Sequence, residues 1–231
     1  STVYTSSGNP VSPLFSFDFQ GLNEDGVPTF INESGQVTTS DIYFQEYNEK
    51  SHLVYEGSID PTITGSFGNV FTYKNFKLNV FMTYAFGNVI RLDPVFKSSY
   101  SDLTAMPKEF KNRWTVQGDE LITNVPVIAD KRLLNNDPYL SYAYNAYNYS
   151  TERVAKGDFI RMKEISLTYD FPAKLIQPLK LTALSLKLQA TNLFLIYSDK
   201  KLNGQDPEFY NSGGVASPMP KQFTLTLRLG I

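Results

Sequence analysis

The chain has 231 residues, a formal net charge of −2 and no cysteine, and aromatic residues make up 14% of it. The lack of cysteine excludes a disulfide framework and a thiolate metal site. No cluster of lysine and arginine offers the basic surface that nucleic acid requires, so nucleic acid is not an expected partner. No long apolar run indicates a transmembrane helix, although an alternating membrane strand would leave no such run.

Period-two alternation of apolar and polar residues predicts antiparallel strands along the chain. A short strand is expected over Leu14–Gln20, followed by a hairpin that joins ITGSFGNVFTY to NFKLNVFMTYAFG through YKNF. Three further strands are expected in FIRMKEISLTYDF, LTALSLKLQATNLFLIY and KQFTLTLRLGI. The opening STVYTSSGNPVSPLF lacks an initiator Met and a signal peptide, so we expect the chain to be a segment of a longer protein.

The connections between these strands alternate in length. Short ones are expected at Tyr73–Phe76 and Pro172–Lys180, and long ones over residues 88–157 and 198–220. All short turns then fall at one end of the sheet and all long loops at the other, as in outer-membrane barrels. A β-sandwich with a covered apolar face is the alternative. Segments of about 10 or more residues favour a tilted membrane crossing.

One face of each predicted strand is apolar, as in Leu184, Leu186 and Leu188 or Leu225, Leu227 and Leu229. In a membrane barrel this face contacts lipid and the opposite face lines a wet lumen. The residues expected to face the lumen are Glu164, Lys187, Gln189, Thr224, Thr226 and Arg228.

No catalytic residue, metal site or cofactor is expected. His52 is the only histidine, and a lone histidine is more often structural than catalytic. No Gly-x-Ser-x-Gly elbow, phosphate-binding loop or paired-histidine helix is present. Carboxylates lie in strings such as NEDG, QGDE and QDPE, where they favour turns.

A tyrosine-rich stretch, DPYLSYAYNAYNYSTER, is the most suggestive binding feature. A tyrosine ring offers a flat apolar face and a polar tip, which suits sugar rings or a protein partner. Packing of the segment against itself or a partner is the alternative, and for Trp114 a structural role competes in the same way. The candidate contact residues are Tyr139, Tyr142, Tyr144, Tyr147, Tyr149 and Trp114.

Six strings resemble, in order, the SusC/RagA class of TonB-dependent transporters of Bacteroidetes. They are PLFSFDFQGLNEDGVPTFINESG, GSIDPTITGSFGNVFTYKNFKLNVFMTYAFGNVI, NRWTVQGDE, VAKGDFIRMKEISLTYDFP, LKLQATNLFLIY with GQDPEFY, and SPMPKQFTLTLRLGI. The chain departs from the pattern at its last residue, because barrel chains often end in Phe and this one ends in Ile231. The resemblance implies an all-β fold in which residues 1–231 supply about the last five or six strands of a roughly 22-stranded barrel.

The resemblance also implies a function and partners. It predicts import of a bulky glycan or peptide across the outer membrane of a Gram-negative bacterium, with a SusD-like surface lipoprotein. TonB would act through a plug region outside this chain, and the remainder of the barrel and outer-membrane lipid would contact the sheet. The rivals are a secreted β-sandwich that binds carbohydrate and, more distantly, a fragment of a glycan hydrolase. Because open strand edges are not tolerated in lipid, the outer strands are expected to pair with another polypeptide segment.

Overall fold

The computed structural model describes residues 10–42, 52–97, 106–137, 139–210 and 219–231. The chain forms two compact units: residues 1–60 and 89–155 belong to unit 1, and residues 61–88 and 156–231 to unit 2. Most regular structure is antiparallel β-sheet with short helices, which confirms the predicted fold class.

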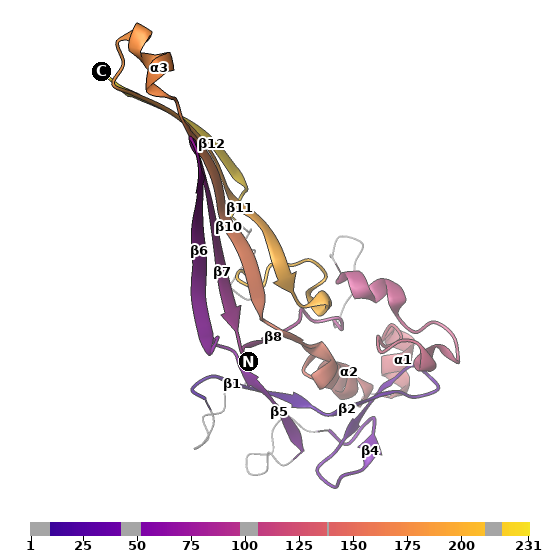
Figure 1. Cartoon of the computed structure of the whole chain (residues 1–231). Helices are drawn as coiled ribbons and strands as arrows, with labels where there is room; N and C mark the ends of the chain where they lie inside the picture. Colours follow the sequence, from indigo (N-terminus) through magenta and orange to yellow (C-terminus); the bar gives the residue numbers. More distant parts are fainter. Residues whose placement is uncertain (1–9, 43–51, 98–105, 138, 211–218) are drawn as a thin grey trace. The chain divides into compact units, whose positions relative to one another are not determined.

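Unit 2 is built on a sheet of five long strands, which run side by side in Figure 1. Its spatial order is β12-β11-β10-β7-β6, so every strand pairs with the long strand next to it in the sequence, in antiparallel orientation. The strands are β6 (Ile63–Tyr73), β7 (Phe76–Phe86), β10 (Phe159–Asp170), β11 (Ala183–Ser198) and β12 (Gln222–Gly230). The predicted hairpin and the alternation of short and long connections are confirmed.

The short connections of unit 2 lie at one end of its sheet. Lys74 and Asn75 turn β6 into β7, and the Asn75 amide donates to the Asp170 carbonyl oxygen at 2.7 Å. Between β10 and β11 the chain forms α3 (Ala173–Ile176) and the 3₁₀ turn η4 (Gln177–Leu179). At the other end, η5 (Lys200–Leu202) follows β11 in the longer connection to β12.

The register of the sheet separates its two faces. Directly paired residues in antiparallel strands carry their side chains on the same face, so each cross-strand row lies on one face of the sheet. One apolar row contains Phe71, Leu78, Leu167, Leu188 and Leu225. The adjacent polar row contains Thr72, Lys77, Thr168, Lys187 and Thr226. The predicted faces are therefore confirmed as rows of the sheet.

Irregularities in β10 and β11 preserve this separation towards the long-loop end. The register shifts between Met162 and Glu164, where β10 has one residue more than β7 and β11 has one more than β10. Asn192 on β11 takes a left-handed backbone conformation at this level. The extra residue shifts the alternation of side chains along β10 by one position. Met162 therefore lies on the apolar face, in a row with Met82 and Phe194.

Unit 1 combines small sheets with short helices. β1 (Pro13–Phe17) pairs with β5 (Leu53–Ser58), and β3 (Pro28–Ile31) lies between β2 (Phe19–Leu22) and β4 (Val37–Thr38). β8 (Val89–Arg91) pairs with β9 (Val154–Lys156). The helical elements are η1 (Lys108–Asn112), η2 (Asp119–Leu121), α1 (Lys131–Asn136), α2 (Leu140–Asn148) and η3 (Thr151–Arg153).

Two sequence expectations are wrong in unit 1. The single strand over Leu14–Gln20 divides at Asp18, because the chain leaves β5 and pairs instead with β3. Residues 88–157 are also not a plain loop. They contribute five helical elements and two short strands, and α2 supplies part of a hydrophobic core. This core consists of Phe17, Phe30, Ile42, Val95, Val125, Ala143, Ala146 and Tyr147.

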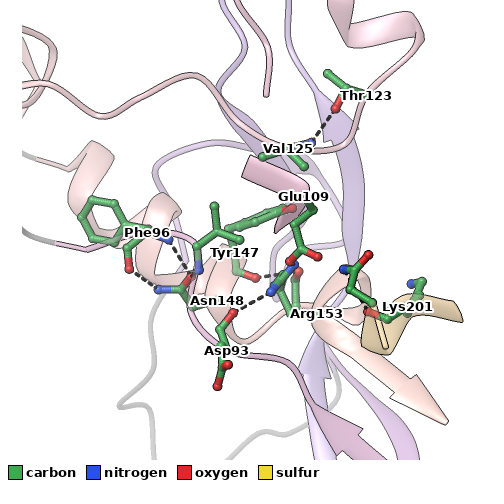
Figure 2. Close-up of polar contacts among 12 residues, drawn as sticks. Asp93, Phe96, Glu109, Thr123, Val125, Tyr147, Asn148, Arg153 and Lys201 are labelled. Carbon is green, nitrogen blue, oxygen red and sulfur yellow. Dashed lines mark hydrogen bonds and ion pairs between the residues drawn. The ribbon is translucent and has the colours of Figure 1, made fainter. Parts of the chain in front are cut away.

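Buried polar side chains fasten the end of α2 to the rest of unit 1 (Figure 2). The side-chain oxygen Oδ1 of Asn148 accepts hydrogen bonds from the backbone amides of Val95 and Phe96 at 3.0 Å each. Its amide group donates to the Phe96 carbonyl oxygen at 3.0 Å. Arg153, on η3, forms an ion pair with Glu109 and donates to the Asp93 carbonyl oxygen. Residues 93–96, which form no helix or strand, are thereby held against the end of α2.

A close contact between Gly26 and Trp114 joins the first and third of the strings that carry the family resemblance. Gly26 has a φ of +74°, and a Cβ placed there would lie 2.4 Å from the Trp114 ring. The Val127 amide donates to the Gly26 carbonyl oxygen at 3.0 Å, beside the same contact. Only a residue without a side chain fits between the turn and the ring.

Replacement of Gly26 with alanine should loosen this part of unit 1. We expect Gly26→Ala to destabilise the local fold by about 2 kcal/mol or more, because strain at positive φ adds to a clash with the ring. Gly35→Ala is the matched control: Gly35 also has a φ of +74°, but nothing lies within 4 Å of its added Cβ. Limited proteolysis of residues 106–127 measures the difference, and equal cleavage of the two variants would contradict the Trp114 contact.

Candidate functional site

The six residues expected to face a lumen share one face of the unit 2 sheet. Lys187 pairs with Thr226, Gln189 with Thr224, and Arg228 with Ser185. Glu164 joins the same face through its carboxylate, which accepts a hydrogen bond from the Asn79 amide at 3.2 Å and lies 3.7 Å from the Lys187 ammonium. We call the face that carries these residues the polar face.

Charges on the polar face are arranged in pairs across strands. The Lys77 ammonium lies 2.9 Å from the Asp170 carboxylate, and both side chains are about half exposed. With the Glu164–Lys187 pair, this places two ion pairs between β10 and its neighbours on either side. Exposed pairs of this kind add little stability, at about 0–1 kcal/mol each. They do give the face fixed charges of both signs.

The opposite, apolar face of the sheet is uncovered. Leu225 and Leu227 are 67% and 58% exposed, and Phe71 and Leu188 are more than half exposed. A β-sandwich would bury this face under a second sheet. The described residues of unit 2 form no second sheet that could cover this face, which argues against the sandwich alternative.

The tyrosine-rich stretch divides into two groups, because much of it forms helix α2. Tyr144 and Tyr147 are buried with Ala143 and Ala146, and burial raises the pKa of Tyr147 above its usual range. Tyr139, Tyr142 and Tyr149 are exposed, and the rings of Tyr139 and Tyr142 stack with centroids 6.4 Å apart. Figure 2 shows Tyr147 among the polar contacts of unit 1. Only the exposed group can reach a ligand from solution.

Trp114 lies at the base of a closed loop. Its amide donates to the Val125 carbonyl oxygen at 2.9 Å, and the Thr123 hydroxyl donates to the Asn112 carbonyl oxygen at 2.5 Å. The indole nitrogen donates to the Glu120 carboxylate at 2.9 Å, and this hydrogen bond is the main cause of a lowered Glu120 pKa. Hydrogen bonds from the Thr115 amide and then the Val116 amide likewise lower the pKa of Asp119.

A buried ion cluster in unit 2 was not predicted from the sequence. The Arg161 guanidinium on β10 pairs with the Asp206 carboxylate, and its Nε lies 3.1 Å from Glu208. Arg161 and Asp206 are almost fully buried. Two of the strings that resemble the family, GDFIRMK and GQDPEFY, thus meet in space. The two strings lie far apart in the sequence, so no local pattern predicts that they touch. The one feature in the sequence that links them is that both resemble the same family.

The same part of the connection between β11 and β12 has a second attachment. The Asp199 carboxylate accepts from the Lys156 amide at 2.8 Å and from the Lys201 amide at 2.9 Å. Leu202 is buried, 1% exposed. Residues 199–208 are therefore fixed at both ends to the long-loop end of the sheet.

The described residues offer no arrangement typical of a metal centre. No group of three or more His, Asp or Glu side chains that could hold a metal lies among them. His52 packs against Phe17, and its Nδ1 lies 3.7 Å from the Glu33 carboxylate. No helix in the described ranges is long and apolar enough to cross a membrane.

Sequence comparison links the chain to a receptor. No family model matches it. A curated relative, TonB-dependent receptor P39 of Formosa agariphila, is 28% identical over 190 residues, which cover 77% of this chain and 17% of the relative. The chain therefore spans about a sixth of the length of the relative it matches.

Structural comparison leads to the same group of proteins. A structure of the RagAB peptide transporter matches with a TM-score of 0.65 and 21% identity, over 94% of this chain and 22% of the matched chain. The open-open and closed-closed states of the RagAB peptide importer match with TM-scores of 0.63 and 0.64. The resemblance to SusC/RagA-type TonB-dependent receptors is confirmed. The matched proteins are a receptor and transporters, in agreement with the expectation that this chain is not an enzyme.

The Arg161 cluster gives a test of how residues 199–208 are held. Asp206→Ala leaves a buried guanidinium with less compensation, and breaking a buried pair costs about 3–5 kcal/mol. We expect faster amide hydrogen exchange in residues 199–208. Lys77→Met is the matched control, since its pair with Asp170 is half exposed and worth at most about 1 kcal/mol. Unchanged exchange in the Asp206 variant would show that the cluster does not hold the segment.

Proposed function

We propose that the chain is part of an outer-membrane TonB-dependent transporter that imports a bulky nutrient, a glycan or a peptide, with a SusD-like surface lipoprotein. The observation that carries the proposal is the single-layer antiparallel sheet, which has an uncovered apolar face and a charged polar face. A single layer with these two faces suits a wall between lipid and water. The similarity in fold to the RagAB structures supports the same assignment.

The sheet has dimensions suited to this role. Aromatic residues lie near both ends of its apolar face. The tilted rings of Phe76 and Tyr169 have centroids 4.7 Å apart near the short turns, and the stacked rings of Tyr84 and Phe86 have centroids 5.5 Å apart near the long connections. The strand between Phe76 and Tyr84 is about 27 Å long at about 3.4 Å per residue. At a tilt of about 40° it spans about 20 Å, comparable with the apolar band of about 25 Å in such barrels.

The remaining partners follow from this assignment. Among the described residues, β6 and β12 each have only one neighbouring strand, so each has an open edge. Open edges in lipid cost several kcal/mol for each unpaired backbone group, so we propose that both edges pair with the remainder of the same barrel. TonB would act through a plug region, to which none of these 231 residues is assigned. Residues 1–231 would then form one functional part of a barrel, although they divide into two compact units.

The orientation of the sheet can be tested by moving a charge from one face to the other. Leu227→Arg should impair assembly in the outer membrane, because arginine at the bilayer midplane costs about 2–4 kcal/mol. Thr224→Arg on the same strand should be tolerated, since Thr224 pairs with Gln189 on the polar face. The amount of heat-modifiable, folded protein in isolated outer membranes measures both variants. Equal assembly of the two would rule out the lipid and lumen assignment.

The exposed tyrosines are the proposed contact site for the nutrient. Tyr139 and Tyr142 present two stacked rings, which suit the flat faces of sugars or aromatic side chains. We expect the double substitution Tyr139→Ala with Tyr142→Ala to reduce nutrient uptake by about 5- to 10-fold, as the loss of two ring contacts implies. Tyr55→Ala, another exposed tyrosine of unit 1, is the control. Uptake equal to wild type in the double variant would remove these residues from the site.

A further inference from the structure

Arg161 lies on the polar face of the unit 2 sheet because β10 contains one extra residue. Arg161 pairs with Thr83, and Glu164 pairs with Phe81 on the same side of β7. Lys163 is the extra residue between these two pairs. Without it, strict alternation from Glu164 would place Arg161 on the apolar face. Bulges often redirect a side chain in this way, and this one directs the guanidinium to the polar side.

The connection that follows β11 is attached to this guanidinium. Arg161 forms the buried ion pair with Asp206, and its Nε lies 3.1 Å from the Glu208 carboxylate. The Phe209 ring also contacts it, with 6.0 Å between the guanidinium carbon and the ring centroid. Since the side chain that holds these three residues leaves the sheet on the polar side, residues 199–209 lie over the polar face.

The opposite face is open at the same level of the sheet. Arg161 is 6% exposed, whereas Phe194 and Tyr197 on the neighbouring strand β11 are 52% and 46% exposed on the apolar side. The segment therefore covers only one of the two faces.

Residues 199–209 have a fixed conformation. The Asp199 carboxylate holds the start of the segment through the Lys156 amide, and the Arg161 cluster holds its end. Between these attachments Asn203 and Gly204, with φ of +53° and +87°, turn the chain.

The surface of the segment suits a water-filled space. Its apolar residues Leu202 and Pro207 are buried. Apart from Gly204, its exposed residues are all polar or charged, which favours contact with water or a hydrated solute over contact with lipid or a packed protein core. They are Lys200, Lys201, Asn203, Gln205 and Glu208.

We propose that residues 199–209 form a shelf that narrows the passage through the transporter at its long-loop end, and that Arg161 is the residue that positions it. This inference rests on the proposed function, which makes the polar face the lining of a water-filled passage. A segment that lies over this face occupies part of the cross-section of the passage. Because selectivity depends on the width of a passage and on the polar groups that line it, the shelf limits the size of the solutes that can pass.

Thiol labelling tests the position of the shelf, since these 231 residues contain no cysteine. Gln205→Cys in the full-length transporter, with any cysteine elsewhere replaced by serine, places one exposed thiol on the shelf. In intact cells a small charged maleimide should react with it. A maleimide that carries a long polyethylene glycol chain should react at least about tenfold more slowly, relative to the ratio of the two rates in unfolded protein. An unchanged ratio, or no reaction with the small reagent, would overturn the proposal.

Release of the shelf tests the role of Arg161. In the Gln205→Cys protein, Asp206→Ala should raise the rate with the large reagent about tenfold, and Asp206→Glu should keep it low. Asp170→Ala is the matched control, because it removes a carboxylate from the half-exposed pair with Lys77 at the short-turn end. Rates are compared for folded, heat-modifiable protein in the outer membrane. Glu208→Ala is a milder variant, which should give a smaller increase. Unchanged rates in both folded variants would refute positioning by Arg161.

Two further cysteines separate failure of the shelf from failure of the proposed function. In isolated outer membranes, the small maleimide should label Thr224→Cys on the polar face and leave Leu227→Cys on the apolar face unmodified. Equal labelling of these two positions would refute the barrel orientation and the shelf together. Labelling of position 224 alone, combined with equal access of both reagents to position 205, would refute only the shelf.

Discussion

Register between antiparallel strands is the constraint on which the rest of the sheet depends. A slip of one residue in any of its strands would carry every leucine of that strand to the charged face. The five strands avoid this over their whole length, and where β10 and β11 change phase near Met162 they do so with extra residues that restore the correct side. Contacts with a second layer cannot enforce this register within unit 2, because its described residues form no second sheet against the apolar face. Backbone ladders and cross-strand pairs such as Phe76 with Tyr169 must therefore supply the order.

Unit 1 is stabilised in a different way, because its helices and strands are too short to be stable alone. Helices of six and nine residues are marginal in water, so tertiary contacts must hold them. Buried polar groups provide these contacts. Asn148 satisfies three backbone groups of the segment at Val95 and Phe96, and Arg153 reaches both Glu109 and Asp93. An alanine in place of either residue would leave buried donors and acceptors without partners, at about 1–3 kcal/mol for each.

The sequence predicted local features well and distant contacts poorly. Period two is a property of neighbouring residues, so the strands around Leu78, Leu188 and Leu227 were located to within a few residues. Helix α2 was missed because its tyrosines were considered as one polar-aromatic string. The spacing of Ala143, Ala146 and Tyr147 at three and four residues was a helical signal that separates the buried group from the exposed one. The contacts of Arg161 with Asp206 and of Trp114 with Gly26 join segments more than forty residues apart, and no local pattern encodes them.

The long connection between β7 and β10 leaves the sheet and returns to it through a narrow neck. The Gly157 amide donates to the Asn88 carbonyl oxygen at 2.8 Å, and the Gly87 amide donates to Asp158 at 2.7 Å. A Cβ on Gly157 would lie 2.1 Å from the Asn88 side-chain amide, so a larger residue at this position would require the Asn88 side chain to move. Because the two ends of this connection are held together, a change in its length or conformation should have little effect on the positions of β7 and β10. Changes within residues 92–153 that keep their packing against Phe17, Phe30 and Ile42 can thus leave the five-stranded sheet unchanged.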